Sequence, residues 1–252
     1  MKPTILTDVE LRAHFFRTRE RTYPLPEGCV LTPAACDFIK EQGITLVPAG
    51  KAMSMSPVPT KNGKPLYINA ATGEELSEKP EELTHLHGNL LVPKTHPRIA
   101  FRGKLDSLQA QIIALQVRCK DEPALLQDLG ELLSACRAIL GAEVKEEPLT
   151  SLRILGMDSG ELRRCSHQVK EVYGIGHPVP SYEMGPICAQ LNLLRTQVRE
   201  TELSAARAFE KSDGTFDRAD LIEGLNRLSS AVYILFCRKV SGWYEQQGGG
   251  NA

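Results

Sequence analysis

Residues 190–209 read QLNLLRTQVRETELSAARAF, and residues 224–240 read GLNRLSSAVYILFCRKV. In the first segment, apolar side chains recur every three or four residues and so lie along one stripe of a helix. The second segment is apolar on nearly all sides, which is typical of a helix covered almost all round by its neighbours. The two stripes consist of Ile187, Leu191, Leu194, Val198 and Ala205, and of Leu221, Leu225, Leu228, Val232 and Leu235. Both segments predict long helices within a helical core.

Helical periodicity also continues upstream of these two segments. Segments 105–119, 123–141 and 159–174 each predict a helix, and the two helices above extend over 185–211 and 217–240. Most connections between the five segments are short, which favours antiparallel packing of neighbouring helices. The sequence therefore predicts an all-α fold, a bundle of about five helices, preceded by a small α+β appendage and a linker.

The first part of the chain forms a small unit of its own. Residues 7–16 predict a short helix, and residues 33–42 predict a second one with Thr32 as its N-cap and Gly43 as its stop. Residues 44–50 predict a brief strand. The unit resembles small helical docking modules of large assemblies, which leaves two alternatives, an interaction surface or a stabilising appendage.

Changes in composition along the chain predict four regions. Residues 1–50 are the docking-like domain, 51–83 a linker with one hairpin near 71–73, 84–242 the helical-bundle domain, and 243–252 a flexible tail. The linker is rich in proline and serine and has little periodicity. The bundle domain is therefore the region able to bury a large core.

The overall composition is that of an ordinary globular protein. The 252 residues include 42% hydrophobic and 24% charged residues with a net charge of −1, values that exclude wholesale disorder or a collagen-like chain. Near-neutrality argues against nucleic-acid binding. The sequence has neither a signal-peptide core nor an apolar run of about 18 residues, which argues against export or a membrane span. Seven scattered cysteines without a C-x-x-C pair predict reduced thiols, and we expect a cytoplasmic protein.

Polar side chains lie at the edges of the last two helices. At about 100° per residue, Arg195, Arg199 and Glu202 fall within roughly 60° of one another beside the apolar stripe. Two guanidinium groups four residues apart repel, so they need either a shared anion or a salt-bridge ladder completed by Glu202. On the following helix, Asn226 and Ser229 lie opposite the core stripe and need either a neighbouring helix or a ligand as partner.

Three motifs together resemble those of corrinoid (cobalamin) adenosyltransferases. The helix predicted over 185–211 carries R-x-x-x-R-x-x-E, and the helix predicted over 217–240 carries N-R-L-S. Residues 92–108, VPKTHPRIAFRGKLDSL, are similar to the family's V-x-K-x-x-x-R motif, which leads into the first helix of its bundle. The motifs occur in the family's order, which makes them far more specific together than singly. An L-T-P-x-A element at residues 31–35 and a T-H-L at residues 84–86 resemble the ethanolamine-utilisation branch of this family.

The resemblance implies a reaction and a set of site residues. Such an enzyme transfers the 5′-deoxyadenosyl group of ATP, carried with Mg²⁺, to the reduced cobalt of a corrinoid (cobalamin). Arg195 and Arg199 would be catalytic residues that stabilise the polyphosphate, and the third catalytic residue, Asp106, would pair with Arg195 of a neighbouring subunit. The residues that would bind the nucleotide are Lys94, Arg98, Glu202 and Asn226. The resemblance also implies a homo-oligomer, dimer or trimer, with ethanolamine-utilisation enzymes or a bacterial microcompartment shell as further partners.

The chain departs from the family pattern at the phosphate-binding loop. The usual T-K-T-G-D-x-G-x-T is absent before Lys94, and residues 84–88 stand in its place. Residues 37–118 contain no cysteine, so the C-C-x-x-C metal motif of many ethanolamine-branch relatives is missing. We therefore expect no protein-bound metal, with His85 and His87 as side chains that either are solvated or support other ligands. The alternative function is a non-catalytic protein that binds or delivers adenosylcobalamin.

Overall fold

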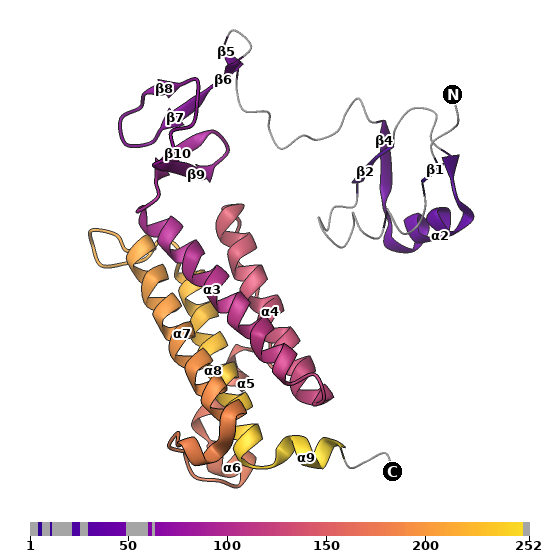
Figure 1. Cartoon of the computed structure of the whole chain (residues 1–252), viewed down its shortest axis with the longest axis vertical. Coiled ribbons are helices and arrows are strands. Elements are labelled where there is room, and N and C mark those ends of the chain that lie inside the picture. Colours follow the sequence, from indigo (N-terminus) through magenta and orange to yellow (C-terminus); the bar gives the residue numbers. More distant parts are fainter. Residues whose placement is uncertain are drawn as a thin grey trace. The chain divides into compact units, whose positions relative to one another are not determined.

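The computed structural model describes residues 5–6, 11, 22–25, 30–48, 60–61 and 64–248. Its contacts divide the chain into two compact units, Met1–Pro59 and Thr60–Ala252. The division falls within residues 51–83, the segment predicted as a linker. Figure 1 draws the helices and strands of both units.

The described part of the first unit contains short strands that pair in parallel. The pairs are β1 (Ile5–Leu6) with β3 (Val30–Leu31), and β2 (Thr22–Leu25) with β4 (Thr45–Pro48). Strand β4 lies within the strand predicted over residues 44–50. The helix predicted over residues 7–16 lies outside the described residues except for Leu11.

Helix α2 (Pro33–Gln42) has the caps that the sequence predicts. The Thr32 side chain accepts a hydrogen bond from the backbone N–H of Ala35, and Gly43 ends the helix with a left-handed φ of 63°. One face of this helix packs against other residues of the first unit. This small core consists of Leu11, Ala35, Phe38 and Ile44.

A four-stranded sheet precedes the bundle in the second unit. The strand order is β8 (Glu75–Leu76), β7 (Tyr67–Asn69), β10 (Leu90–Pro93) and β9 (Leu83–His87). Strands β7 and β8 form the antiparallel hairpin predicted near residues 71–73. Strand β10 pairs in parallel with β7 and antiparallel with β9, and neither β9 nor β10 was predicted. A shorter antiparallel pair lies upstream, β5 (Thr60–Lys61) with β6 (Lys64–Pro65).

Long antiparallel helices form the predicted bundle. They are α3 (Pro97–Arg118), α4 (Pro123–Val144), α5 (Ser159–His167), α7 (Gly185–Phe209) and α8 (Ala219–Val240), with the short α6 (Val169–Tyr173) and η2 (Tyr182–Met184) between α5 and α7. Figure 1 shows α3 and α8 starting at the end that carries the sheet, and α4 and α7 ending there. Helices α5 and α6 lie at the opposite end. Every residue of the two predicted apolar stripes lies in the bundle core or packs against it.

Local signals fix several helix ends. Pro123 occupies the first turn of α4, where its missing N–H is not needed. At the start of α5, the Asp158 side chain accepts from the N–H of Glu161, and the Glu161 carboxylate accepts from the N–H of Asp158. The single helix predicted over residues 159–174 is broken at Gln168, whose φ of −101° and ψ of 48° are not helical.

A buried polar network closes the end of the bundle far from the sheet. Arg238 of α8 donates to the Asp128 carboxylate at 2.7 Å, and Tyr244 donates to the same oxygen at 2.6 Å. The Arg238 guanidinium also lies 4.4 Å from the ring centroid of Trp243. These contacts hold α9 (Trp243–Gly248), whereas the sequence predicted a flexible tail from residue 243. Tyr244 thus has a partner that lies 116 positions away in the sequence, which a local pattern does not show.

The described cysteines are all free thiols, and all except Cys36 are buried. Burial raises the pKa of Cys136 to about 12, so this thiol stays protonated at physiological pH. Among the helices that the structure describes, none is both long enough and apolar enough to cross a membrane.

Candidate functional site

An open cavity of about 540 Å³ lies between α7 and α8, beside the end of α5. Helix α7 lines it with two arginines and a glutamate, and α8 lines it with an amide, hydroxyl groups and a phenol. The polar lining residues are chiefly Arg195, Arg199, Glu202, Asn226, Ser229 and Tyr233. The cavity therefore brings together four of the residues that the sequence predicts for the site.

Neither arginine of the cavity forms an ion pair within the part of the chain that the structure describes. Arg195 is half-buried and donates from Nη2 to the Asn192 side chain at 3.2 Å, while Arg199 is exposed. The salt-bridge ladder with Glu202 is therefore absent. Two unpaired positive charges line the cavity, and an anion with several oxygen atoms is the ligand that they favour.

Glu202 instead bonds to the neighbouring helix. Asn226 Nδ2 donates to Glu202 Oε1 at 3.1 Å, and Ser230 donates to the backbone oxygen of Asn226 at 3.2 Å. Asn226 is exposed at the cavity, so this side of α8 is open, whereas the sequence predicted that it is covered. The Glu202 carboxylate and the Asn226 amide thus form a pair of hydrogen-bonding groups that a ligand in the cavity can contact.

Tyr233 forms another part of the cavity wall. Its Oη lies 2.9 Å from His177 Nδ1, and the two rings are nearly parallel with centroids 6.2 Å apart. Burial, followed by the nearby Cys237 thiol, raises the pKa of Tyr233 to about 12, so the phenol is neutral at physiological pH. His177 thus ties the loop before α7 to the cavity. Sequence reasoning missed this contact because it joins residues 56 positions apart.

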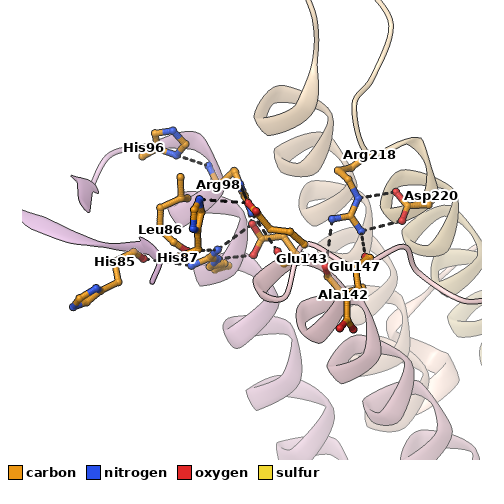
Figure 2. Close-up of polar contacts among 12 residues, drawn as sticks. His85, Leu86, His87, His96, Arg98, Ala142, Glu143, Glu147, Arg218 and Asp220 are labelled. Carbon is orange, nitrogen blue, oxygen red and sulfur yellow. Dashed lines mark hydrogen bonds and ion pairs between the residues drawn. The ribbon is translucent and has the colours of Figure 1, made fainter. Parts of the chain in front are cut away.

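Lys94 and Arg98 lie near the start of α3, at the sheet end, and do not line the cavity. Lys94 is exposed, with Nζ 3.7 Å from the Glu81 carboxylate. Arg98 donates from all three guanidinium nitrogens to the end of α4, where its acceptors are the side chain and backbone of Glu143 and the side chain of Glu146. Figure 2 shows Arg98 directed at Glu143. The structure therefore separates these two predicted residues from the four that line the cavity.

Asp106 is an exposed residue of α3 that also lies outside the cavity. It forms no ion pair with any residue of the described ranges. Ile113 and Val117 follow it at helical spacing on the same face and are 44% and 69% exposed. The exposed face of α3 therefore carries one carboxylate and two apolar side chains.

Comparison with known proteins identifies the family. The family model described as cobalamin adenosyltransferase matches residues 76–239, which include the whole cavity. This chain belongs to the cobalamin adenosyltransferase family. The match confirms the resemblance that was inferred from the three motifs.

Similar proteins include two curated adenosyltransferases. Corrinoid adenosyltransferase EutT of Salmonella typhimurium is 32% identical over 250 residues, which cover 94% of this chain and 92% of the relative. The protein of the same name from Escherichia coli K12 is 33% identical over 251 residues, with the same coverage of both chains. No solved structure matches the chain.

The histidines of β9 in this adenosyltransferase are exposed and lie near other protein groups. His85 Nδ1 lies 3.0 Å from the backbone oxygen of Gly88, and His87 Nε2 lies 3.9 Å from the Glu146 carboxylate. Within the described ranges, no three His, Cys, Asp or Glu side chains are grouped so that they could hold a metal ion. The expected lack of a protein-bound metal stays a prediction.

Proposed function

We propose that this chain transfers the 5′-deoxyadenosyl group of ATP to the reduced cobalt of a corrinoid and so makes adenosylcobalamin. The observation that carries the proposal is the unpaired pair of Arg195 and Arg199 on the wall of the α7–α8 cavity. The family match supports the reaction class. The arginine pair supports the polyphosphate of ATP as the anion that the cavity binds.

The chemistry explains why positive charge is needed there. A bond forms between cobalt and the ribose C5′, with the electron pair supplied by the reduced cobalt, and the bond from C5′ to the polyphosphate oxygen breaks. The leaving polyphosphate takes the electrons of the broken bond, so its negative charge grows in the transition state. Fixed positive groups beside it lower the barrier, and guanidinium groups suit this role because they bond phosphate oxygens in pairs.

The cavity residues have two roles: the arginines stabilise negative charge, and Glu202 and Asn226 orient the nucleotide. Arg199 contacts the departing polyphosphate, and Arg195, steadied by Asn192, adds a second charge. Glu202 accepts hydrogen bonds from nucleotide hydroxyl or amino groups, while Asn226 both donates and accepts. Such positioning fixes C5′ for attack, and the corrinoid itself supplies the nucleophilic metal.

We further propose that each site is shared between two copies of the chain. Among the residues described, Arg195 has no carboxylate partner and Asp106 has no cationic partner. A second copy that brings its α3 to the cavity pairs these charges and covers Ile113 and Val117. The enzyme is then a homo-oligomer.

The EutT name of the two relatives supports ethanolamine utilisation as the metabolic context. In that context the enzyme renews adenosylcobalamin for an ethanolamine-degrading enzyme, in the cytoplasm or inside a microcompartment. The N-terminal unit with α2 is the part of the chain proposed to dock onto these partners.

An anaerobic assay tests the reaction. Protein mixed with ATP, Mg²⁺ and chemically reduced cobalamin is expected to produce adenosylcobalamin, followed by its absorbance change. Mixtures without ATP or without protein are the controls. Binding of cobalamin with no ATP affinity and no turnover would instead identify a non-catalytic carrier.

The purified protein is expected to contain no stoichiometric zinc or iron, because the C-C-x-x-C motif is missing. Activity should need only Mg²⁺ or a similar ion to accompany ATP. Elemental analysis, together with activity before and after chelation and Mg²⁺ addition, measures this. About one tightly held transition metal per chain, lost together with activity, would contradict the prediction and direct attention to His85 and His87.

A further inference from the structure

A buried carboxylate at the end of α4 holds two arginines of α3. The Glu143 side chain is fully buried, and those of Arg98 and Arg102 are 16% and 17% exposed. Arg98 Nε donates to Glu143 Oε1 at 2.6 Å, and Arg102 Nε donates to Glu143 Oε2 at 2.5 Å. Glu146 accepts from Arg98 Nη1 at 2.7 Å. The network thus contains two positive and two negative groups, a balance that burial of charge requires.

Arg102 joins this network to the sheet. Its Nη2 donates to the backbone oxygen of Leu86 at 2.8 Å, and its Nη1 donates to that of His85 at 3.4 Å. Both acceptors belong to β9, and Figure 2 shows this strand beside the network. The buried side chains of β9 and β10 are not members of the bundle's core cluster. Polar contacts to the backbone, rather than a shared apolar core, therefore tie β9 to the helices.

The turn that follows α4 contains a residue with a left-handed backbone conformation. Glu146 has a φ of 56°, which lies in the left-handed region that non-glycine residues rarely adopt. Its carboxylate nevertheless meets Arg98, and the hydrogen bond from Arg98 lowers the pKa of Glu146. The backbone N–H groups of Glu146 and Glu147 bond back to Glu143 and Ala142, so this residue ends the helix, and its ion pair with Arg98 fixes that helix end to α3.

We propose that Glu143 is a positioning residue for the phosphate end of the nucleotide. Its carboxylate fixes Arg98 and Arg102, Arg102 fixes the backbone of β9, and the β9–β10 hairpin leads directly to Lys94. The inference rests on the proposed site shared between two copies, and on the phosphate contact that the family resemblance implies for Lys94. In that site the sheet end of one copy meets the polyphosphate held by Arg195 and Arg199 of the other. Arg98 then acts through Glu143 instead of touching ATP, because two carboxylates already neutralise its charge and its side chain is only 16% exposed.

Glu143→Gln is the decisive variant, since it keeps the shape of the side chain and removes the charge that both arginines share. Hydrogen exchange of the amides in residues 83–93 reports the order of the hairpin, and steady-state kinetics report its effect on ATP. We expect exchange in the hairpin and the KM for ATP each to rise about tenfold, with kcat changed less than about twofold.

Asp128→Asn is the matched control. It removes a buried carboxylate from an arginine at the other end of the bundle, so it should lower the unfolding temperature without changing hairpin exchange or KM. Arg102→Lys keeps the charge but loses the planar fork that reaches Glu143 and Leu86 together. Arg102→Lys should therefore increase hydrogen exchange in the hairpin and raise the KM for ATP. It tests the proposal even if the Glu143→Gln protein does not fold.

Three results would overturn the proposal. In the first, a folded Glu143→Gln protein keeps a protected hairpin and an unchanged KM. In the second, Glu143→Gln raises the KM for ATP while the hairpin stays protected. In the third, Asp128→Asn increases hydrogen exchange in the hairpin as much as Glu143→Gln does. A wild-type protein without adenosylation activity would overturn the proposed function instead, and the exchange measurement, which needs no turnover, would still decide whether Glu143 anchors β9.

Discussion

Arg199→Ala is expected to slow adenosylation about a hundredfold, comparable to the loss of one preorganised donor that stabilises transition-state charge. Arg199 lines the cavity, is exposed, and has no carboxylate partner among the described residues. Its removal therefore leaves no buried charge behind and no gap in the core. The loss should fall mainly on kcat, because the polyphosphate gains its extra charge only in the transition state.

Arg207→Ala provides the matched control for this prediction. Arg207 is exposed on the same helix, about two turns closer to its end, and does not line the cavity. Circular dichroism should show the same helix content for both variants and the wild type, while only Arg199→Ala loses activity. Unchanged turnover in Arg199→Ala would remove the polyphosphate role from this residue.

The long helices could be predicted because local signals define them. Apolar side chains recur at the helical period through α7 and α8, and the buried stripes are those predicted. Pro123 marks the start of α4 because the first turn needs no N–H. The predicted helix over 217–240 is observed as Ala219–Val240, a difference of the size that fraying helix ends produce.

Elements with distant partners could not be predicted in the same way. Strand β10 pairs with β7 on one side and β9 on the other, and each strand is too short to show a clear period. Helix α9 depends on Tyr244, whose partner Asp128 lies 116 positions away. A local window of sequence contains neither partner.

The arginine pair was predictable from spacing alone, because residues four apart share a helix face. The structure adds what spacing does not give, namely that Asn226 of α8 bonds to Glu202 and opens onto the same cavity. The separation of Lys94 and Arg98 from that cavity also follows only from the structure.

Glu143 was missed, although the sequence contains a signal for it. It follows Cys136 and Ile139 at helical spacing on the buried stripe of α4, and a charged residue at a core position needs a charged partner. The sequence does not show which partner. Arg98 and Arg102 precede Glu143 by 45 and 41 positions, so only the packing of α3 on α4 identifies them.

Asp106→Asn and Arg195→Ala are each expected to weaken activity and assembly together. If the pair lies at a desolvated contact between two copies, removal of one charge costs about 3 to 5 kcal/mol, because the other charge is left buried alone. Light scattering and the adenosylation rate measure the two effects. Asp217→Asn is the control, since it removes a carboxylate from an exposed ion pair with Lys211 at 2.8 Å. Exposed ion pairs contribute little to stability, so this variant should keep both its activity and its assembly.

Mixing the two weakened variants distinguishes a shared site from two independent defects. The Asp106→Asn chain still supplies an intact Arg195, and the Arg195→Ala chain still supplies an intact Asp106, so some contacts in a mixed oligomer join two intact residues. Partial activity should therefore return once differently tagged chains have exchanged. A fully active monomer, or no recovery in mixtures shown to exchange, would contradict the shared site. Asp106 would then be an ordinary exposed carboxylate in the middle of α3, which begins at Pro97 rather than at residue 105 as the sequence predicted.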